Sequence, residues 1–253
     1  MLFADVTCLK LYINLSSCFM IKYIKAWLPA RDEVGTPGRA ARRFLGMMRR
    51  EYHGEPLLEA HISADPIEQF STWFDQAIKQ VKDDPNAMLI STVGSDGQPS
   101  SRTVLLKEFD ENGFVFYTNY QSRKARQISE NPKVSITFYW PEMLRQVHIE
   151  GIAEKVPESQ SDEYFATRPP ASRLGAWASA QSRTLNSREE LEKIFEDIKN
   201  RFNKQDIPRP PEWGGFNVSP YRMEFWQGRL NRLHDRICYS KNDSKWHITR
   251  LSP

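Results

Sequence analysis

The fold is decided by a stretch that reads Ala87-Met88-Leu89-Ile90-Ser91-Thr92-Val93, then Gly94-Ser95-Asp96-Gly97-Gln98-Pro99, then a second run from Ser101 to Phe109. Asp110-Glu111-Asn112-Gly113 turns the chain again, into a third run from Phe114 to Thr118. Short runs of β-branched and aromatic residues between Gly-, Asp- and Asn-rich turns are typical of antiparallel strands joined by hairpins. The stretch therefore predicts three consecutive strands.

The same texture continues towards the C-terminus. Further strands are expected at Lys133 to Trp140, Gln146 to Val156, Phe216 to Trp226, Leu230 to Tyr239 and Lys245 to Leu251, with Lys241-Asn242-Asp243-Ser244 as a hairpin turn. Helical segments are inserted between these runs rather than alternating with them, which argues against a doubly wound parallel sheet. We therefore expect a mainly β fold, an antiparallel barrel with peripheral helices.

The helices are marked by capping residues and by apolar residues at helical spacing. Asp65, Pro66 and Glu68 predict an N-cap, a first helical position and a capping box. The apolar face that follows comprises Ile67, Phe70, Phe74, Ala77, Ile78 and Val81. Ser122 predicts the cap of a short helix reaching Glu130. Later helices are expected at Glu158 to Thr167, at Ser172 to Ala180, and after a capping box at Ser187 and Glu190, where Leu191, Ile194, Phe195, Ile198 and Phe202 form the apolar stripe.

Composition excludes several classes of function. The chain has 253 residues and a net charge of +3, with 40% hydrophobic and 26% charged residues. It is long enough for a globular core, and its excess charge is too small to indicate a nucleic-acid partner. Three cysteines without close spacing and five histidines without ligand spacing predict neither disulfides nor a metal site. The sequence contains no P-loop, dinucleotide-binding fingerprint or nucleophile elbow.

Residues 1–47 are expected to be an extension that precedes a single domain of residues 48–253. Leu11 to Ile21 is apolar but far shorter than the ~20 residues that a membrane-spanning helix needs. Asp5 and the single basic residue Lys10 argue against a signal peptide, and the lack of arginine before Arg31 argues against a mitochondrial transit peptide. A dispensable extension is the favoured interpretation, a targeting role is the alternative, and a cytoplasmic location is expected.

Basic residues set in β structure are the strongest candidates for a binding site. In Arg232-Leu233-His234-Asp235-Arg236, strand alternation would place Arg232, His234 and Arg236 on one face. Three potentially cationic groups on one face repel each other unless an anion lies over them, and guanidinium groups suit phosphate oxygens. A solvated edge strand explains the same pattern, and spacing alone favours that explanation.

Three other basic clusters have two interpretations each. Arg102 and Lys107 should not share a face in a regular strand, which leaves a bulge, a neighbouring subunit or a ligand-lined backbone as explanations. Ser122-Arg123-Lys124-Ala125-Arg126 lies at an expected helix start, where free N–H groups suit phosphate, although a solvated helix face is equally compatible. Arg39 to Arg50 holds five arginines but a single aromatic residue, so a solvated segment is favoured over an RNA-binding one.

A family resemblance extends this reading. The sequence contains, in order, Arg102-Thr103-Val104-Leu105-Leu106-Lys107, Tyr117-Thr118-Asn119 with Ser122-Arg123-Lys124, Phe138-Tyr139-Trp140, Arg145-Gln146-Val147, Gln181-Ser182, Trp213-Gly214-Gly215 and Trp226 to Arg236. Together these runs resemble the pyridoxine/pyridoxamine 5′-phosphate oxidases, over roughly Met48 to Pro253. The resemblance implies a homodimeric split β-barrel with two FMN sites at the subunit interface. A site at the interface would explain how Arg102 and Lys107 can both serve a ligand although they do not share a strand face.

The resemblance also implies roles for individual residues. FMN would be held by Arg102, Thr103, Val104, Leu105, Lys107, Tyr117, Thr118, Arg123, Lys124, Gln146, Gln181, Ser182, Trp226 and Arg236. Lys107, Tyr164, Arg168 and Ser172 would grip the substrate phosphate, and Arg232, Leu233 and His234 would lie beside the pyridine ring, with Arg232 and His234 as the catalytic pair. Arg49, Arg50, Glu51 and Tyr52 match a segment that can cover the site.

The implied reaction is the oxidation of pyridoxine or pyridoxamine 5′-phosphate to pyridoxal 5′-phosphate. Hydride passes from the 4′ carbon to the flavin, and dioxygen reoxidises the flavin to give hydrogen peroxide, with ammonia released from the amine. One alternative is a split-barrel flavoprotein that reduces another substrate with a nicotinamide cofactor; the joint presence of Tyr164, Arg168, Ser172, Arg232 and His234 argues against it. A non-catalytic carrier of FMN or pyridoxal phosphate is the other.

Overall fold

The computed structural model describes residues 50–253 except 204 and 244. The predicted extension of residues 1–47 and the predicted site residue Arg49 lie outside the described residues, and the predicted domain boundary remains a prediction. Contacts divide the chain into one unit of Met1–Glu51 and another of Tyr52–Pro253. In the first unit, Arg50 and Glu51 are exposed. The helices and strands of the described residues all lie in the second unit.

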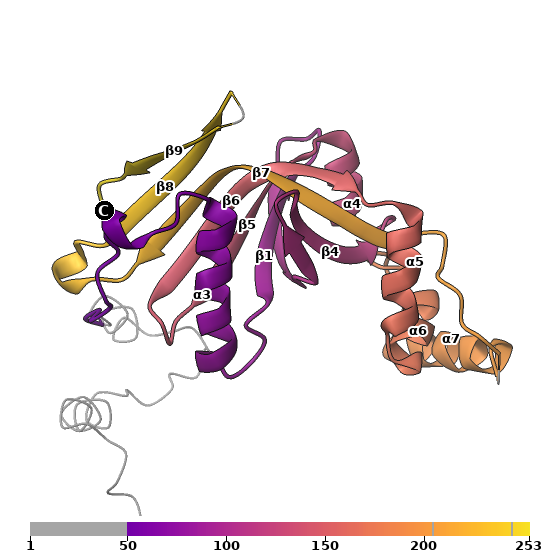
Figure 1. Cartoon of the computed structure of the whole chain (residues 1–253). Helices are drawn as coiled ribbons and strands as arrows, with labels where there is room; N and C mark the ends of the chain where they lie inside the picture. The colour runs from indigo at the N-terminus through magenta and orange to yellow at the C-terminus, as the bar shows by residue number, and fades with distance from the viewer. Residues whose placement is uncertain (1–49, 204, 244) are drawn as a thin grey trace, which may run out of the picture. The chain divides into compact units, whose positions relative to one another are not determined.

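A single antiparallel sheet organises this unit (Figure 1). Its described strands are β1 (Ala87–Val93), β2 (Pro99–Leu105), β3 (Glu108–Asp110), β4 (Gly113–Asn119), β5 (Lys133–Trp140), β6 (Arg145–Lys155), β7 (Trp213–Gln227), β8 (Asp235–Asn242) and β9 (Lys245–Arg250). They lie in the order β2-β1-β5-β6-β7-β4-β3, with β8 paired to β7 and β9 to β8. The expected mainly β, antiparallel fold is confirmed.

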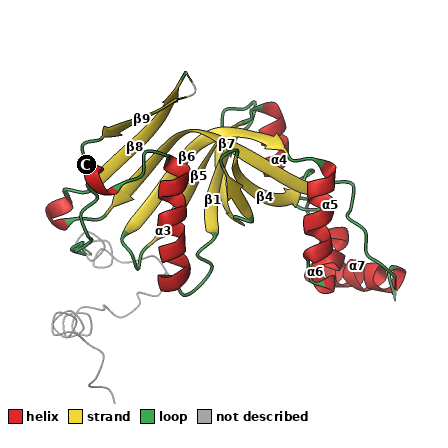
Figure 2. Ribbon diagram, in the orientation of Figure 1, coloured by secondary structure: helices red, strands yellow, loops and turns green. Residues whose placement is uncertain are grey.

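Strand β7 gives the sheet its curl, which Figure 2 shows. Its first half pairs with β4, from Trp213 to Val218, and its second half pairs with β8, from Arg222 to Gln227. Between these halves, the β6–β7 register shifts next to Gly151. A Cβ at Gly151 would lie 2.6 Å from the carbonyl oxygen of Ser219, so only glycine fits this close approach.

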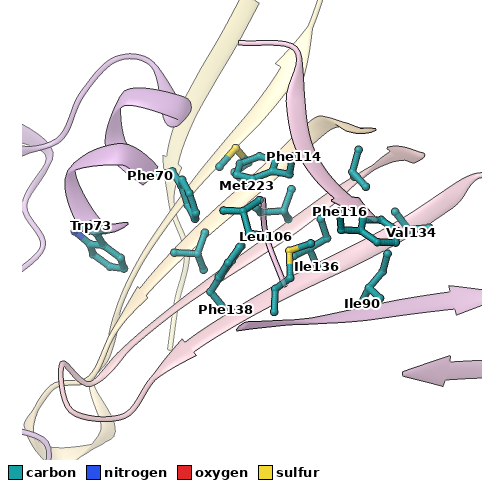
Figure 3. Close-up of a cluster of buried hydrophobic side chains, with 14 of the residues drawn as sticks. Phe70, Trp73, Ile90, Leu106, Phe114, Phe116, Val134, Ile136, Phe138 and Met223 are labelled. Carbon is teal, nitrogen blue, oxygen red and sulfur yellow. The ribbon is translucent and has the colours of Figure 1, made fainter. Parts of the chain in front are cut away.

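Helix α3 (Pro66–Gln80) packs its aromatic residues against the sheet (Figure 3). Phe70 is fully buried, with ring centroids 4.9 Å from Phe114 and 5.0 Å from Phe138. The buried face also contains Trp73, which the predicted stripe omitted, whereas the predicted Ile78 is 55% exposed. The stripe was wrong at Ile78 because the sheet covers a narrower face of the helix than the apolar residues occupy.

The start of α3 confirms the predicted cap in a modified form. The Asp65 side chain accepts hydrogen bonds from the backbone N–H groups of Ile67 and Glu68, at 2.6 and 3.3 Å. A capping box also requires the Glu68 side chain to accept a hydrogen bond from the Asp65 N–H. This part of the prediction is wrong, because the Ser63 hydroxyl lies between the two groups. Ser63 Oγ accepts from the Asp65 N–H and donates to the Glu68 carboxylate.

The remaining helices lie near the ends of strands. Helix α4 (Arg123–Glu130) begins at the predicted cap Ser122, whose side chain accepts from the Ala125 N–H. Helix α5 (Glu158–Thr167) packs on β7, and α6 (Pro170–Ala178) packs on α7 (Arg188–Arg201). The apolar stripe of α7 is only half-buried in this chain.

The strand predicted from Leu230 to Tyr239 is wrong in its first half. The β7–β8 ladder closes at the pair Gln227–Asp235, which leaves Gly228 to His234 as a connecting loop. Within this loop Leu230–Arg232 is a short 3₁₀ turn, in which Asn231 and Arg232 have positive φ of 55° and 59°. Strand alternation therefore does not apply to Arg232 and His234, and the expected common face with Arg236 does not form.

Among the described residues, no helix is long and apolar enough to cross a membrane. The same part of the chain contains no group of three or more His, Cys, Asp or Glu side chains that could hold a metal ion.

Candidate active site

A cavity of about 710 Å³ lies where the ends of β2 and β4 meet α4, α5 and α6. Eleven residues predicted from the sequence line it: Thr103, Val104, Leu105, Lys107, Tyr117, Thr118, Lys124, Tyr164, Arg168, Ser172 and Gln181. Its lining also contains residues for which no role was predicted, namely Asn119, Thr167, Pro169, Gly175, Ala176, Ser179 and Trp213. Of these, Asn119 and Trp213 carried a signal in the sequence, as members of the Tyr-Thr-Asn and Trp-Gly-Gly runs.

Lys124 is a buried cation at one side of this cavity. Its ammonium donates to Thr118 Oγ1 at 3.0 Å and to Gln181 Oε1 at 2.9 Å. Burial, and then the positive charge of Arg102, lower the pKa of Lys124 to about 8. Because its neighbours offer only neutral oxygens, the ammonium favours an added anion.

Arg102 is a second cation near Lys124, although it does not line the cavity. Its guanidinium donates to Thr92 Oγ1 and to Ser100 Oγ, both at 2.7 Å. Burial, and then the charge of Arg123, lower its pKa. Among the described residues, neither Arg102 nor Lys124 forms an ion pair with a carboxylate.

The start of α4 contributes neutral polar groups to the same region. The backbone N–H of Arg123 donates to Ser182 Oγ at 3.2 Å, and Ser182 has a positive φ of 70°. Thus Arg123, Lys124, Gln181 and Ser182, expected together from the family resemblance, are brought together by contacts across about 60 residues of chain.

A stack of three aromatic rings forms another wall of the cavity. The ring of Tyr117 lies 4.0 Å from that of Tyr164 and 5.3 Å from that of Trp213, with interplanar angles of 14° and 7°. A Cβ at Gly215 would lie 2.8 Å from the Tyr117 ring, so the second glycine of Trp-Gly-Gly makes room for the stack. The sequence run therefore has a packing explanation.

Arg168 covers the Trp213 end of this stack. Its guanidinium carbon lies 4.7 Å from the Trp213 ring centroid, close enough for a cation–π interaction. Nη1 of Arg168 is buried and has no hydrogen-bond partner in the described part of the chain. A buried guanidinium nitrogen without an acceptor is costly, and an anion in the cavity would satisfy it.

A second cluster of predicted residues lies on β6, β7 and β8 and in the loop before β8. Gln146, Trp226 and Arg236 lie in one row across β6, β7 and β8, because Gln146 pairs with Trp226 and Trp226 with Arg236. His234 packs on Trp226 with ring centroids 4.7 Å apart, and Tyr52 meets both rings edge-on, at 5.9 Å from Trp226 and 5.4 Å from His234. None of these residues lines the first cavity.

A backbone hydrogen bond selects one tautomer of the His234 ring. The backbone N–H of Arg229 donates to its Nδ1 at 3.0 Å, which places the proton of the neutral imidazole on Nε2. Burial, and then the charge of Arg232, lower the pKa of His234. In the neutral imidazole, the N–H donor is therefore at Nε2.

Of the remaining predicted residues, Arg236 is held by hydrogen bonds, whereas Arg232 and Leu233 are exposed. Arg236 donates to both oxygens of Glu224, at 2.8 and 3.1 Å, and to the carbonyl oxygen of Ser252. Arg232 is exposed, and Leu233 is 68% exposed. Glu224 was missed by sequence reasoning, because it lies 12 residues before Arg236 and meets it only diagonally across the β7–β8 ladder, in which Glu224 pairs with Cys238 and Arg236 with Trp226.

Comparison with known proteins places this chemistry in a family. A family profile described as pyridoxamine 5′-phosphate oxidase matches residues 74–202, and one described as the pyridoxine 5′-phosphate oxidase C-terminal dimerisation region matches residues 213–253. The chain is 54% identical over 213 residues to the pyridoxine/pyridoxamine 5′-phosphate oxidase of Rubrobacter xylanophilus, covering 84% of this chain and 98% of the relative. It is 52% identical to that of Nostoc punctiforme, with coverages of 81% and 97%.

Solved structures are similar as well. The crystal structure of PhzG from Burkholderia lata 383, in complex with tetrahydrophenazine-1-carboxylic acid, superimposes with a TM-score of 0.74 at 31% identity. The match covers 79% of this chain and 99% of PhzG. An FMN-binding protein related to pyridoxamine 5′-phosphate oxidase, from Nostoc punctiforme PCC 73102, shares the fold with a TM-score of 0.60 at 19% identity, over 76% of this chain and all of that one.

Proposed function

The chain belongs to the pyridoxine/pyridoxamine 5′-phosphate oxidase family, and from this premise we propose that it oxidises both phosphorylated substrates to pyridoxal 5′-phosphate with FMN as cofactor and dioxygen as acceptor. Hydrogen peroxide is the second product, and ammonia is released when the substrate is the amine. The relatives bear the name of this activity at about 50% identity over four-fifths of the chain or more.

One observation supports the proposal most directly: the cavity offers two separate points that favour an anion. Lys124, with Arg102 beside it, is a buried cation without a carboxylate partner among the residues that the structure describes. Arg168, over Trp213, presents a buried nitrogen that has no acceptor within the described part of the chain. A phosphorylated cofactor and a phosphorylated substrate would need one such point each.

The donor set around Lys124 fits FMN. We assign the flavin phosphate to Arg102, Arg123, Lys124 and Ser182, and the rest of the molecule to the strand backbone and side chains of Thr103, Val104, Leu105, Lys107, Tyr117, Thr118 and Gln181. The substrate phosphate is assigned to Lys107, Tyr164, Arg168 and Ser172, all of which line the cavity. Bound FMN supplies the acceptor for the hydride that leaves the substrate.

A second copy of the chain completes this site in the proposal. Gln146, Trp226, Arg236, Arg232, Leu233 and His234 are outside the lining of the cavity, yet the family resemblance assigns them to the same ligands. The match of residues 213–253 to a dimerisation region supports a homodimer. We therefore assign this second cluster to the cavity of the partner subunit, where Arg232 and His234 orient the substrate ring and the N–H at Nε2 of His234 donates to it.

Tyr52 belongs to the covering segment in this proposal. Its ring contacts Trp226 and His234 edge-on and so shields the face where the substrate ring is assigned. Exclusion of water there strengthens the hydrogen bonds that orient the substrate. For Arg49, Arg50 and Glu51, the covering role rests on the family resemblance alone.

The proposed activity is tested on the purified protein. A flavin absorbance spectrum is expected, and pyridoxamine 5′-phosphate under air should give pyridoxal 5′-phosphate and hydrogen peroxide. A yellow protein that forms neither product would indicate the alternative, a non-catalytic carrier. A colourless protein that does not bind added FMN would contradict both interpretations.

The shared site is tested by complementation. Arg168→Ala removes a residue of the cavity, whereas His234→Ala removes one of the second cluster, and with substrate well below the wild-type KM each homodimer should show only a small fraction of the wild-type rate. Co-expression gives mixed dimers in which one of the two sites is intact, so about a quarter of wild-type activity is expected if subunits pair at random. Activity no higher than that of the single variants would place both residues in one chain's site.

A further inference from the structure

Asp235 is the one acidic residue in the run Arg232 to Arg236, and the proposed function gives it no role. Its carboxylate binds donors from three parts of the chain. Oδ1 accepts from Arg250 Nη1 at 2.7 Å, while Oδ2 accepts from the Leu57 N–H at 3.1 Å and lies 3.4 Å from Arg229 Nε. Both oxygens are therefore used, and the side chain is 18% exposed.

The first branch of this network holds the segment from Tyr52 to Glu59. Arg250 forms a two-pronged ion pair with Glu59, at 2.7 and 2.8 Å, and donates to the carbonyl oxygen of Leu57 at 2.7 Å. Figure 1 shows the start of the described chain beside the C-terminal strands. The segment is thus joined to β8 and β9 by charged hydrogen bonds, which are stronger than neutral ones.

The second branch holds the loop from Gly228 to His234. The Arg229 side chain, beside Asp235, also donates to the Gly54 carbonyl oxygen, and the Gly54 N–H donates to the Gly228 carbonyl oxygen at 3.2 Å. The backbone N–H of Arg229 is the donor to His234 Nδ1. Asp235 therefore joins the loop that carries His234 to the segment that carries Tyr52, without touching either side chain.

We propose that Asp235 is a positioning residue that fixes these two segments against each other and so sets the edge-on contacts of Tyr52 with Trp226 and His234. The inference rests on the proposed function and extends it to a residue outside the ligand-binding set. Asparagine has nearly the shape of aspartate but one acceptor oxygen instead of two. Asp235→Asn can therefore keep either the Arg250 side or the Leu57 and Arg229 side of the network, and not both.

Kinetics of a double-mutant cycle test the proposal. With pyridoxamine 5′-phosphate under air, Asp235→Asn is expected to raise KM about tenfold and to change kcat less than about twofold, because cover and orientation are lost while the reacting groups remain. Tyr52→Ala should lower kcat/KM about tenfold in the wild type but less than about twofold in the Asp235→Asn background, since coupled residues act non-additively.

Hydrogen exchange supplies a readout that is independent of turnover. In Asp235→Asn, the peptide that contains Gly54 and Leu57 should exchange faster, because both N–H groups depend on the network. A peptide from β1 should be unchanged. If Asp235→Asn does not fold, Glu59→Gln serves in its place, since Glu59 is exposed and its loss weakens only the Arg250 branch.

Glu192→Gln is the matched control. It removes one carboxylate from an exposed ion pair with Arg188 on α7, far in sequence from both segments. This variant should leave KM unchanged and should combine additively with Tyr52→Ala. The proposal is overturned if Asp235→Asn is also additive with Tyr52→Ala, or if exchange at 52–59 does not change. An inactive wild type would instead contradict the proposed function.

Discussion

Lys124 Nζ lies 2.9 Å from Oε1 of Gln181, a residue 57 positions further along the chain. This contact holds a buried ammonium at the cavity wall with only neutral partners, and its pKa is lowered to about 8. An anion bound beside it would favour the charged form, so binding should be coupled to proton uptake.

FMN binding should therefore weaken as pH rises. The free protein loses the Lys124 proton above about pH 8, so the affinity of apoprotein for FMN should fall between pH 7 and pH 9.5. Lys124→Met should bind FMN about tenfold to hundredfold more weakly at pH 7, because a charged hydrogen bond is lost. Quenching of flavin fluorescence measures both effects. A variant whose affinity falls as steeply with pH as the wild type would contradict the assignment to Lys124.

Arg168 should contribute to substrate binding more than to turnover. Removing its unpaired guanidinium in Arg168→Ala is expected to raise KM for pyridoxamine 5′-phosphate about tenfold to hundredfold, with a smaller change in kcat. Inorganic phosphate should inhibit the wild type competitively and this variant weakly. Arg188→Ala, which removes an exposed arginine on α7, is the matched control and should behave as wild type. If Arg168→Ala lowered kcat and left KM unchanged, Arg168 would not be binding the substrate phosphate.

Gly215 should be intolerant of even one methyl group. In Gly215→Ala the Cβ would lie 2.7 Å from Val156 and 2.8 Å from Tyr117, so the aromatic stack must shift. Overpacking of this kind costs about 1–3 kcal/mol, measurable by thermal unfolding, and should lower the FMN content. Gly94→Ala is the control, because its closest contact is the flexible end of Glu130. Equal stability of the two variants would show that the stack can move freely.

Glu224 should make stability depend on acid pH. Burial raises its pKa, but the guanidinium groups of Arg236 and Arg222 outweigh burial and lower it below the ordinary value of 4.5. A depressed carboxylate pKa stabilises the fold above the unfolded-state pKa, and this contribution is lost as pH falls through the folded-state pKa. Glu224→Gln should be less stable by about 1.5–3 kcal/mol at pH 7.

The pH dependence of that difference is the decisive measurement. Chemical denaturation of wild type and Glu224→Gln should give free energies of unfolding that converge below pH 4.5, as the wild-type carboxylate is protonated. A difference that stays constant from pH 7 to pH 3 would mean that the charge of Glu224 is not the cause.

The sequence was most informative where structure is local. The hairpin at Gly94 to Pro99, the cap at Ser122 and the long strand run that became β7 depend on neighbouring residues, and each forms close to its predicted bounds. Alternation failed at Arg232 because the β7–β8 ladder closes at Asp235, which is a property of strand pairing. Asn231 was the available signal, since asparagine tolerates the positive φ that the loop adopts.

The candidate site was predicted mainly through family resemblance. Periodicity could not have joined Lys124 to Gln181 or Arg236 to Glu224, because these contacts depend on how distant elements pack. The role of Trp213 was also out of reach, since its partners Tyr117 and Arg168 come from β4 and the end of α5. Residue types indicated phosphate chemistry, and tertiary structure divided the residues into two clusters.

The parallel rings of Tyr117 and Trp213 have an optical consequence. A tyrosine this close to a tryptophan transfers its excitation energy, so part of the emission of Trp213 reports on the geometry of the cavity wall. A flavin or pyridoxal group entering the cavity absorbs where tryptophan emits and should quench that signal. The fluorescence of Trp213 should therefore report whether the cavity is occupied. The variant Trp213→Phe would show how much of the total emission comes from Trp213.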